Sequence, residues 1–157
     1  LQAFAAPVFN NTIFSNNYSP NEGGAIYTED KSSSRLFNVS FINNCAQSSG
    51  GALAMTINST ANIIGCVFDN NTSGSKGGAI AIMNQACPTI QDSIIQNNSA
   101  NSGGALYVTD DGAPVFSNCF IHHNTANSRG GAIYTSSAAN CSFTHCTISD
   151  NTAITGT

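Results

Sequence analysis

Gly77-Gly78-Ala79-Ile80 is the central one of five Gly-Gly-Ala-Ile/Leu tetrapeptides that decide the fold of this chain. The other copies are Gly23-Gly24-Ala25-Ile26, Gly50-Gly51-Ala52-Leu53, Gly103-Gly104-Ala105-Leu106 and Gly130-Gly131-Ala132-Ile133. The steps between their first glycines are 27, 27, 26 and 27 residues. A fixed period in this range is typical of a solenoid, in which each repeat forms one turn and only stacked turns bury a continuous core.

An asparagine recurs with the same period, at Asn17, Asn44, Asn71, Asn98, Asn124 and Asn151. A large apolar residue stands three positions before each, at Phe14, Phe41, Phe68, Ile95, Ile121 and Ile148, and another stands eight positions before, at Phe9, Leu36, Ile63, Ile90, Phe116 and Phe143. One 26-residue step occurs in both the glycine and the asparagine series, so a single deletion in one loop explains both. The chain therefore holds about six coils of 27 residues. We expect the asparagines to stack as a hydrogen-bonded ladder, with Asn17 and Asn71 buried.

The short apolar segments predict strands rather than helices. Residues 8–14 hold two patches around an Asn pair and residues 24–28 form a third, each rich in β-branched or aromatic types. Three short strands per coil, with bends between them, predict an all-β right-handed parallel β-helix that spans residues 1–157 as one unit. The apolar columns and the Ile/Leu of the tetrapeptide should point inward. So should a column of small residues at Thr12, Val39, Cys66, Ser93, Cys119 and Cys146. The alanine of the tetrapeptide fits either a tight corner or a flat face that packs on a partner.

The repeated motifs resemble those of the chlamydial polymorphic outer-membrane protein family. The second motif of the family is present as Phe14-Ser15-Asn16-Asn17, Phe41-Ile42-Asn43-Asn44 and Phe68-Asp69-Asn70-Asn71, with Ile in place of Phe in the later repeats. The resemblance covers essentially the whole chain and extends to other secreted right-handed β-helices. It implies a surface-exposed, adhesive passenger segment. The family also has a membrane barrel at its end, which nothing in this chain resembles.

Composition limits the partners of the chain. Only 8% of residues are charged, the net charge is −4, and there are four basic residues, so we expect no nucleic-acid partner. No apolar run approaches the roughly 18 residues of a membrane span. We expect neither a cofactor nor a metal, because the chain has no Cys-x-x-Cys pair and His122, His123 and His145 do not share a column with the cysteines.

The chain starts at Leu1, just after the position of a missing tetrapeptide, and stops at Thr157, the position of the first glycine of the next one. Neither end carries the polar cap that solenoids usually have, so both end coils should be bare. We therefore expect either a fragment of a longer β-helix or a subunit that stacks end to end with copies of itself.

The cysteines and the sequons suggest an extracellular or cell-surface protein. Six cysteines in a Ser-, Thr- and Asn-rich chain suit an oxidising compartment. Cys119 and Cys146 share a column in adjacent coils and are the candidate disulfide, with two buried free thiols as the alternative. Covalent glycans are expected if the source is a eukaryote, and unmodified surface asparagine is the alternative. The candidate sites are Asn10, Asn38, Asn58, Asn70, Asn97 and Asn140.

No acidic residues converge in the way that polysaccharide cleavage requires. His123 and Asp150 share an outward column in neighbouring coils and are the best candidate pair, but we favour a surface ion pair or a solvated histidine over a catalytic role. We therefore predict a non-catalytic extracellular rod or filament. An adhesin-type binding module is the second hypothesis, and a polysaccharide lyase or hydrolase is the third.

Overall fold

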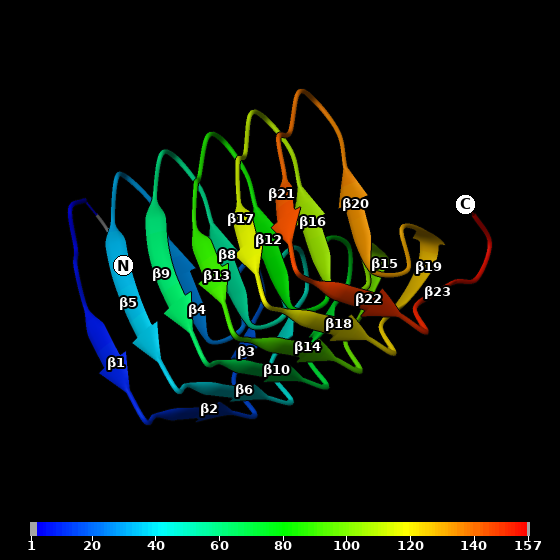
Figure 1. The fold of residues 1–157 in the computed structure, drawn as a ribbon, viewed down its shortest axis with the longest axis horizontal. Helices are drawn as coiled ribbons and strands as arrows, with labels where there is room; N and C mark the ends of the chain where they lie inside the picture. The colour runs from blue at the N-terminus through cyan, green and yellow to red at the C-terminus, as the bar shows by residue number, and fades with distance from the viewer. Residues whose placement is uncertain (1–2, 157) are drawn as a thin grey trace.

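The computed structural model describes residues 3–156 and shows a parallel β-helix, with coils stacked along its long axis (Figure 1). Within these residues there are four parallel sheets. Sheet A contains β1 (Val8–Asn10), β5 (Ser33–Phe37), β9 (Thr60–Ile64), β13 (Thr89–Gln91), β17 (Val115–Ser117) and β21 (Ser142–Thr144). Sheet B contains β2 (Ile13–Ser15), β6 (Ser40–Ile42), β10 (Val67–Asp69), β14 (Ile94–Gln96), β18 (Phe120–His122) and β22 (Thr147–Ser149).

The other two sheets complete each coil. Sheet C contains β3 (Tyr18–Ser19), β7 (Cys45–Ala46), β11 (Thr72–Ser73), β15 (Ser99–Ser102), β19 (Thr125–Arg129) and β23 (Thr152–Ala153). Sheet D contains β4 (Ile26–Thr28), β8 (Leu53–Met55), β12 (Ile80–Ile82), β16 (Leu106–Val108) and β20 (Ile133–Thr135). The predicted fold is confirmed, but a coil has four short strands rather than the three that the sequence suggested. The additional strand, in sheet C, follows the ladder asparagine and consists mostly of small polar residues, so it gives no apolar signal.

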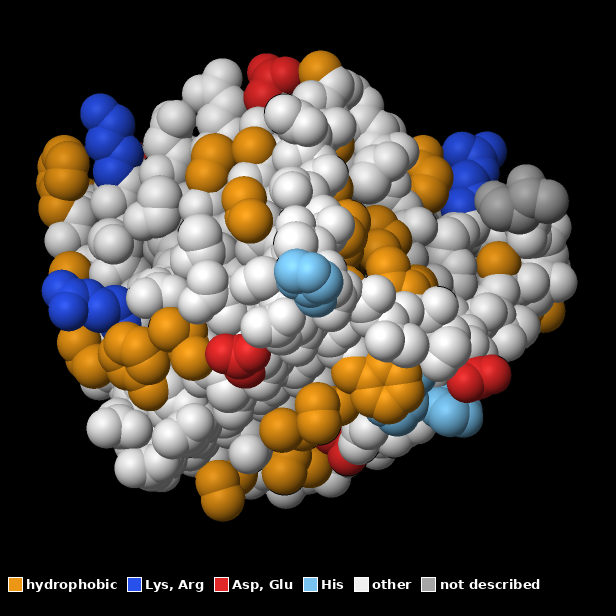
Figure 2. All heavy atoms as spheres, in the orientation of Figure 1, with side chains coloured by type: hydrophobic (Ala, Val, Ile, Leu, Met, Phe, Trp, Pro, Cys, Tyr) orange, Lys and Arg blue, Asp and Glu red, His pale blue; other side chains and the backbone are white. Residues whose placement is uncertain are grey.

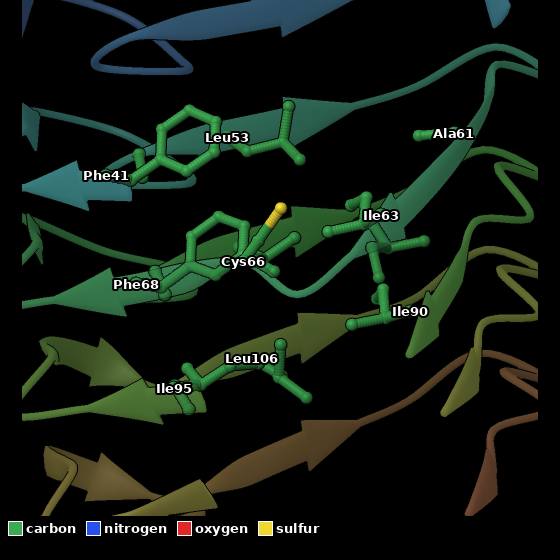
Figure 3. Packing of buried hydrophobic residues seen from close by; sticks show 14 of the residues in the cluster. Phe41, Leu53, Ala61, Ile63, Cys66, Phe68, Ile90, Ile95 and Leu106 are labelled. Atoms are coloured by element: carbon green, nitrogen blue, oxygen red, sulfur yellow. The ribbon is translucent and has the colours of Figure 1, made fainter. Parts of the chain in front are cut away.

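The predicted inward columns form the core. In the middle coils, the apolar columns of sheets A and B and the Ile/Leu column of sheet D are fully buried (Figure 3). Each side chain packs on its counterpart one coil away. The rings of Phe41 and Phe68, for example, stack with centroids 4.7 Å apart and planes 5° apart. Side chains of similar shape therefore form continuous stacks through the interior, and this stacking packs successive coils closely.

The six periodic asparagines lie in a continuous ladder of amides. The Nδ2 of Asn71 donates to Oδ1 of Asn98 at 3.0 Å and to the carbonyl oxygen of Phe41 at 3.0 Å, and its backbone N–H donates to the same Oδ1 at 2.8 Å. The other amide–amide contacts repeat this geometry at 2.9 to 3.0 Å. Asn71 is fully buried, but Asn17 is exposed, so the expectation for Asn17 is wrong. Asn17 lies in the first coil, where no described strand stacks on its outer side.

The two glycines of the tetrapeptide are needed for different structural reasons. The first has a left-handed backbone, with φ +65° at Gly77. The second touches the next coil, because a Cβ on Gly78 would overlap the carbonyl oxygen of Gly104. The alanine that follows is buried in the core at this corner, as Ala79 and Ala105 show. Its backbone carbonyl accepts two N–H groups from the preceding coil, which fits the tight-corner explanation for alanine.

The single deletion lies inside sheet C. Ser99 and Ala100 pair with residues 26 positions later, at Thr125 and Ala126, whereas Ser102 pairs with Arg129, 27 positions later. The register shift between Ala100 and Ser102 absorbs the missing residue before the next Gly-Gly corner. The start at Leu1 and the stop at Thr157 lie outside the described residues. Residues 3–156 contain no helix long and apolar enough to cross a membrane.

Replacing Asn71 with alanine should destabilise the β-helix strongly. The change leaves the backbone N–H of Asn44 without its acceptor and deprives the carbonyl of Phe41 of the Nδ2 donor inside the core. Each such loss costs about 1–3 kcal/mol. We expect the thermal midpoint, followed by circular dichroism, to fall by about 10 °C. Asn17→Ala is the matched control in the exposed end coil, and equal losses at both sites would contradict a buried ladder.

Replacing Gly78 with alanine should destabilise the protein by about 3 kcal/mol, because the new methyl group meets backbone that has no room to move. Gly65→Asn provides the control. Gly65 also has a positive φ, but the corresponding corner in other coils is Asn11, Asn38 or Asn118. Chemical denaturation should place Gly65→Asn within about 1 kcal/mol of the parent. A Gly78→Ala variant as stable as Gly65→Asn would overturn the close-approach explanation.

Candidate functional site

The candidate glycosylation asparagines all lie on the surface of the rod. Four of them occupy left-handed corners, and at three of these the amide of one coil bonds to a side chain of the coil before. Asn70 donates to Asn43 at 2.7 Å, Asn97 donates to Asp69 at 2.9 Å, and Asn38 approaches Asn11 at 3.4 Å. Each of these Nδ2 groups retains a second N–H.

The side chains of the other three candidates, Asn10, Asn58 and Asn140, make no hydrogen bond within residues 3–156. Asn58 stands at a left-handed corner, φ 57°, between sheets D and A. Every candidate is thus sterically accessible.

All six cysteines are free thiols in the structure, so the predicted Cys119–Cys146 disulfide is not formed. Each of the two thiols instead points to the carbonyl oxygen two residues earlier. Cys119 donates to Ser117 at 3.3 Å and Cys146 donates to Thr144 at 3.4 Å. The alternative of two buried free thiols holds for Cys119, which is buried, whereas Cys146 is only partly buried.

The same contact recurs along the small-residue column at every position except Val39, whose side chain has no donor. Thr12, Cys66 and Ser93 also donate to the carbonyl two residues earlier, at 3.1, 3.4 and 2.7 Å. The intervening residue takes a left-handed conformation in every coil. The carbonyls of Ile64, Gln91, Ser117 and Thr144 also accept a backbone N–H from the preceding coil, so the side chain is their second donor. Cysteine here replaces serine or threonine as a small donor. Burial raises the pKa of the Cys119 thiol to about 11, so its reactive thiolate is scarce at neutral pH.

The predicted His123–Asp150 pair does not form a hydrogen bond. Asp150 follows β22 in the coil next to His123, as the pairing of His122 with Ser149 requires. The Nδ1 of His123 instead lies 2.6 Å from the Nδ1 of His122. Sequence reasoning missed this contact, because it compared residues one coil apart and these two are adjacent in the chain.

Acidic residues lie scattered on the rod, and Figure 2 shows few charged side chains on the visible face. Within residues 3–156, no three His, Cys, Asp or Glu side chains come together in a way that could hold a metal ion. The surface hollows are open. One of about 490 Å³ is lined by Ser19, Asn21, Glu22, Tyr27 and Ser48. Another, of about 530 Å³, lies on the outer face of sheet A around Arg35, Asn62 and Thr89.

Tyr27 is the most distinctive side chain of the first hollow. Its hydroxyl donates to a carboxylate oxygen of Glu29 at 3.1 Å. Partial burial, helped by this contact, raises the pKa of Tyr27 to about 12. The phenol is therefore neutral at physiological pH and can offer a partner its ring face and its oxygen.

Comparison with known families agrees with this geometry. The model of the Chlamydia polymorphic membrane protein repeat matches residues 11–29 and 38–55, which confirms the resemblance carried by the repeated motifs. The model of the right handed beta helix region matches residues 52–156, more than half of the chain. No curated protein and no solved structure matches the chain. With coils stacked in parallel over the whole described length, the chain belongs to the right-handed β-helix family.

Proposed function

We propose that this chain is a non-catalytic structural segment of a cell-surface or extracellular rod. The observation that carries the proposal is the contrast between the sides and the ends of the β-helix. Along the sides, the backbone N–H and C=O groups of each coil are hydrogen-bonded to the neighbouring coils. The ends expose the core. Phe14 in the first coil is half-buried while Phe41 in the second is fully buried, and Ile148 is 45% exposed while Ile121 is fully buried.

The exposed ends are suited to further coils of the same kind. A coil added to either end would continue the stacked side chains and the amide ladder at the usual spacing of about 4.8 Å. The next coil is either part of a longer chain or the end coil of another copy. Both arrangements give an elongated, unbranched rod, because only the two ends have unpaired strand edges.

The similarity to a polymorphic membrane protein repeat supports a location at the surface. The low charge and the abundance of Ser, Thr and Asn suit a solvated rod outside the cell. The distribution of acids supports a non-catalytic role. Glu29 and Asp110, for example, sit in equivalent loops three coils apart, about 14 Å at the coil spacing and farther than paired carboxylates in glycosidases.

An adhesin-type binding module is the second candidate. The observation that favours it is the hollow beside Tyr27, where an aromatic ring, the carboxylate of Glu22 and two serine hydroxyls face solvent together. Aromatic rings with a few polar groups are common features of binding surfaces. The two candidates are compatible, since a rod can carry a binding surface on its side.

Residues 1–157 produced alone should associate end to end as their concentration rises. Negative-stain imaging and sedimentation should then find rods longer than one unit, with a constant width. Ile148→Lys should abolish the association, because it places a charge in the core at one end. Ile94→Lys is the matched control in the same sheet, since Ile94 is 37% exposed on the outer side of a middle coil.

Two results would count against assembly through the ends. One is a population of short rods that stays monodisperse at every concentration tested. The other is association that Ile94→Lys disrupts and Ile148→Lys does not, since this would place the contact on the side of the rod.

We also propose that the exposed sequons accept glycans when the chain passes through a eukaryotic secretory pathway. Intact mass measured before and after glycosidase treatment should differ by several glycans. Thr60→Ala removes the sequon of Asn58 and leaves Asn58 itself in place, so it should remove one glycan only. An intact mass that glycosidase leaves unchanged would reject the proposal.

A further inference from the structure

Two histidines meet where sheet B ends in the fifth coil. His122 is the last residue of β18 and points outward, and His123 occupies the corner that follows. Their Nδ1 atoms lie 2.6 Å apart, and their rings are nearly perpendicular, at 82°. The short contact requires that one Nδ1 carries a hydrogen and the other offers a lone pair, so at least one imidazole is neutral.

The surrounding structure holds the ring of His122 and the backbone of the pair. The ring of Phe120 stacks on the ring of His122, with centroids 4.0 Å apart. The carbonyl of His122 accepts hydrogen bonds from the Nδ2 of Asn124 and the backbone N–H of Asn97, at 2.9 and 3.4 Å. The backbone that carries the pair is therefore held by the amide ladder on one side and by the previous coil on the other.

The corner itself is unusual at this position. The four preceding coils place asparagine there, at Asn16, Asn43, Asn70 and Asn97. His123 has the same left-handed backbone, with φ 53°. In the next coil the corner is Asp150, whose carboxyl group has no hydrogen-bond partner in the described part of the chain. An acidic side chain thus stands one coil away from the two imidazoles.

We propose that His122 and His123 bind one divalent transition-metal ion, such as Cu²⁺ or Ni²⁺, between their Nδ1 atoms. Imidazole suits these ions, and two nitrogen ligands at about 2.0 Å lie about 2.8 Å apart at a right angle or about 3.3 Å apart at a tetrahedral angle. The observed separation is closer to the right angle of square-planar and tetragonal sites, so Cu²⁺ and Ni²⁺ fit better than Zn²⁺. Water completes the coordination.

Metal binding requires a lone pair on both Nδ1 atoms. The ring that carries hydrogen on Nδ1 must become the Nε2–H tautomer, with the proton exchanged through solvent. Both imidazoles stay neutral, and no oxidation or bond cleavage is involved. Since both rings are solvent-accessible, the few tenths of an ångström of separation that the ion needs come from side-chain rotation.

Calorimetric titration of Ni²⁺ into the folded protein, stripped of metal with chelator, tests the site. We expect saturable one-to-one binding that His122→Gln and His123→Asn each weaken at least about tenfold. Both substitutions use residues that the adjacent coil has at the same positions, Gln96 and Asn97, so the fold should be retained. Circular dichroism checks this.

His145→Asn is the matched control. His145 is also exposed at a left-handed corner, where other coils have asparagine, but it has no histidine neighbour. It should bind Ni²⁺ with the parent affinity. Absence of saturable binding to the parent protein would overturn the proposal. So would equal binding by the parent, His122→Gln and His123→Asn, since this would place the ion elsewhere on the protein.

Discussion

The repeated hydrogen bonds between ladder asparagines are the interaction on which the rest of the structure depends. Each of the four interior amides joins three coils, because it donates to the next coil and to the preceding one and accepts from the preceding asparagine. This fixes the axial register of sheets B and C at every turn. Once register is fixed there, each apolar side chain meets its own counterpart, and the core fills without further adjustment.

Packing along the rod therefore differs from packing around a coil. Along the rod, a side chain stacks on a similar side chain in the next coil, as the Phe41 and Phe68 rings do. Around a coil, neighbours differ, and left-handed corners, most of them filled by Gly, Asn, Asp or His, separate the short strands. The glycine pairs matter in both directions. The first glycine allows the chain to turn, and the second leaves room for the backbone of the next coil.

Much of this was predictable from the period alone, because a residue 27 positions away must be a neighbour. The burial of Phe41, Leu53 and Ile63 follows from that. The short strands of sheet C were not predictable, since Cys45-Ala46 and Thr72-Ser73 carry no apolar alternation. The role of cysteine as a local donor depends on where Cys119 directs its thiol, and the column position could not reveal this. The His122–His123 contact depends on the positive φ of His123, which the asparagines of the same column suggest only in retrospect.

The same contacts also make the molecule modular. Since every interface between coils repeats the one before, inserting or excising a block of 27 residues would preserve all remaining neighbours. The length of such a protein can thus change in increments of one coil, about 4.8 Å, while its cross-section stays constant. Gene duplication or recombination within the repeats would yield a graded series of lengths without a new folding problem to solve.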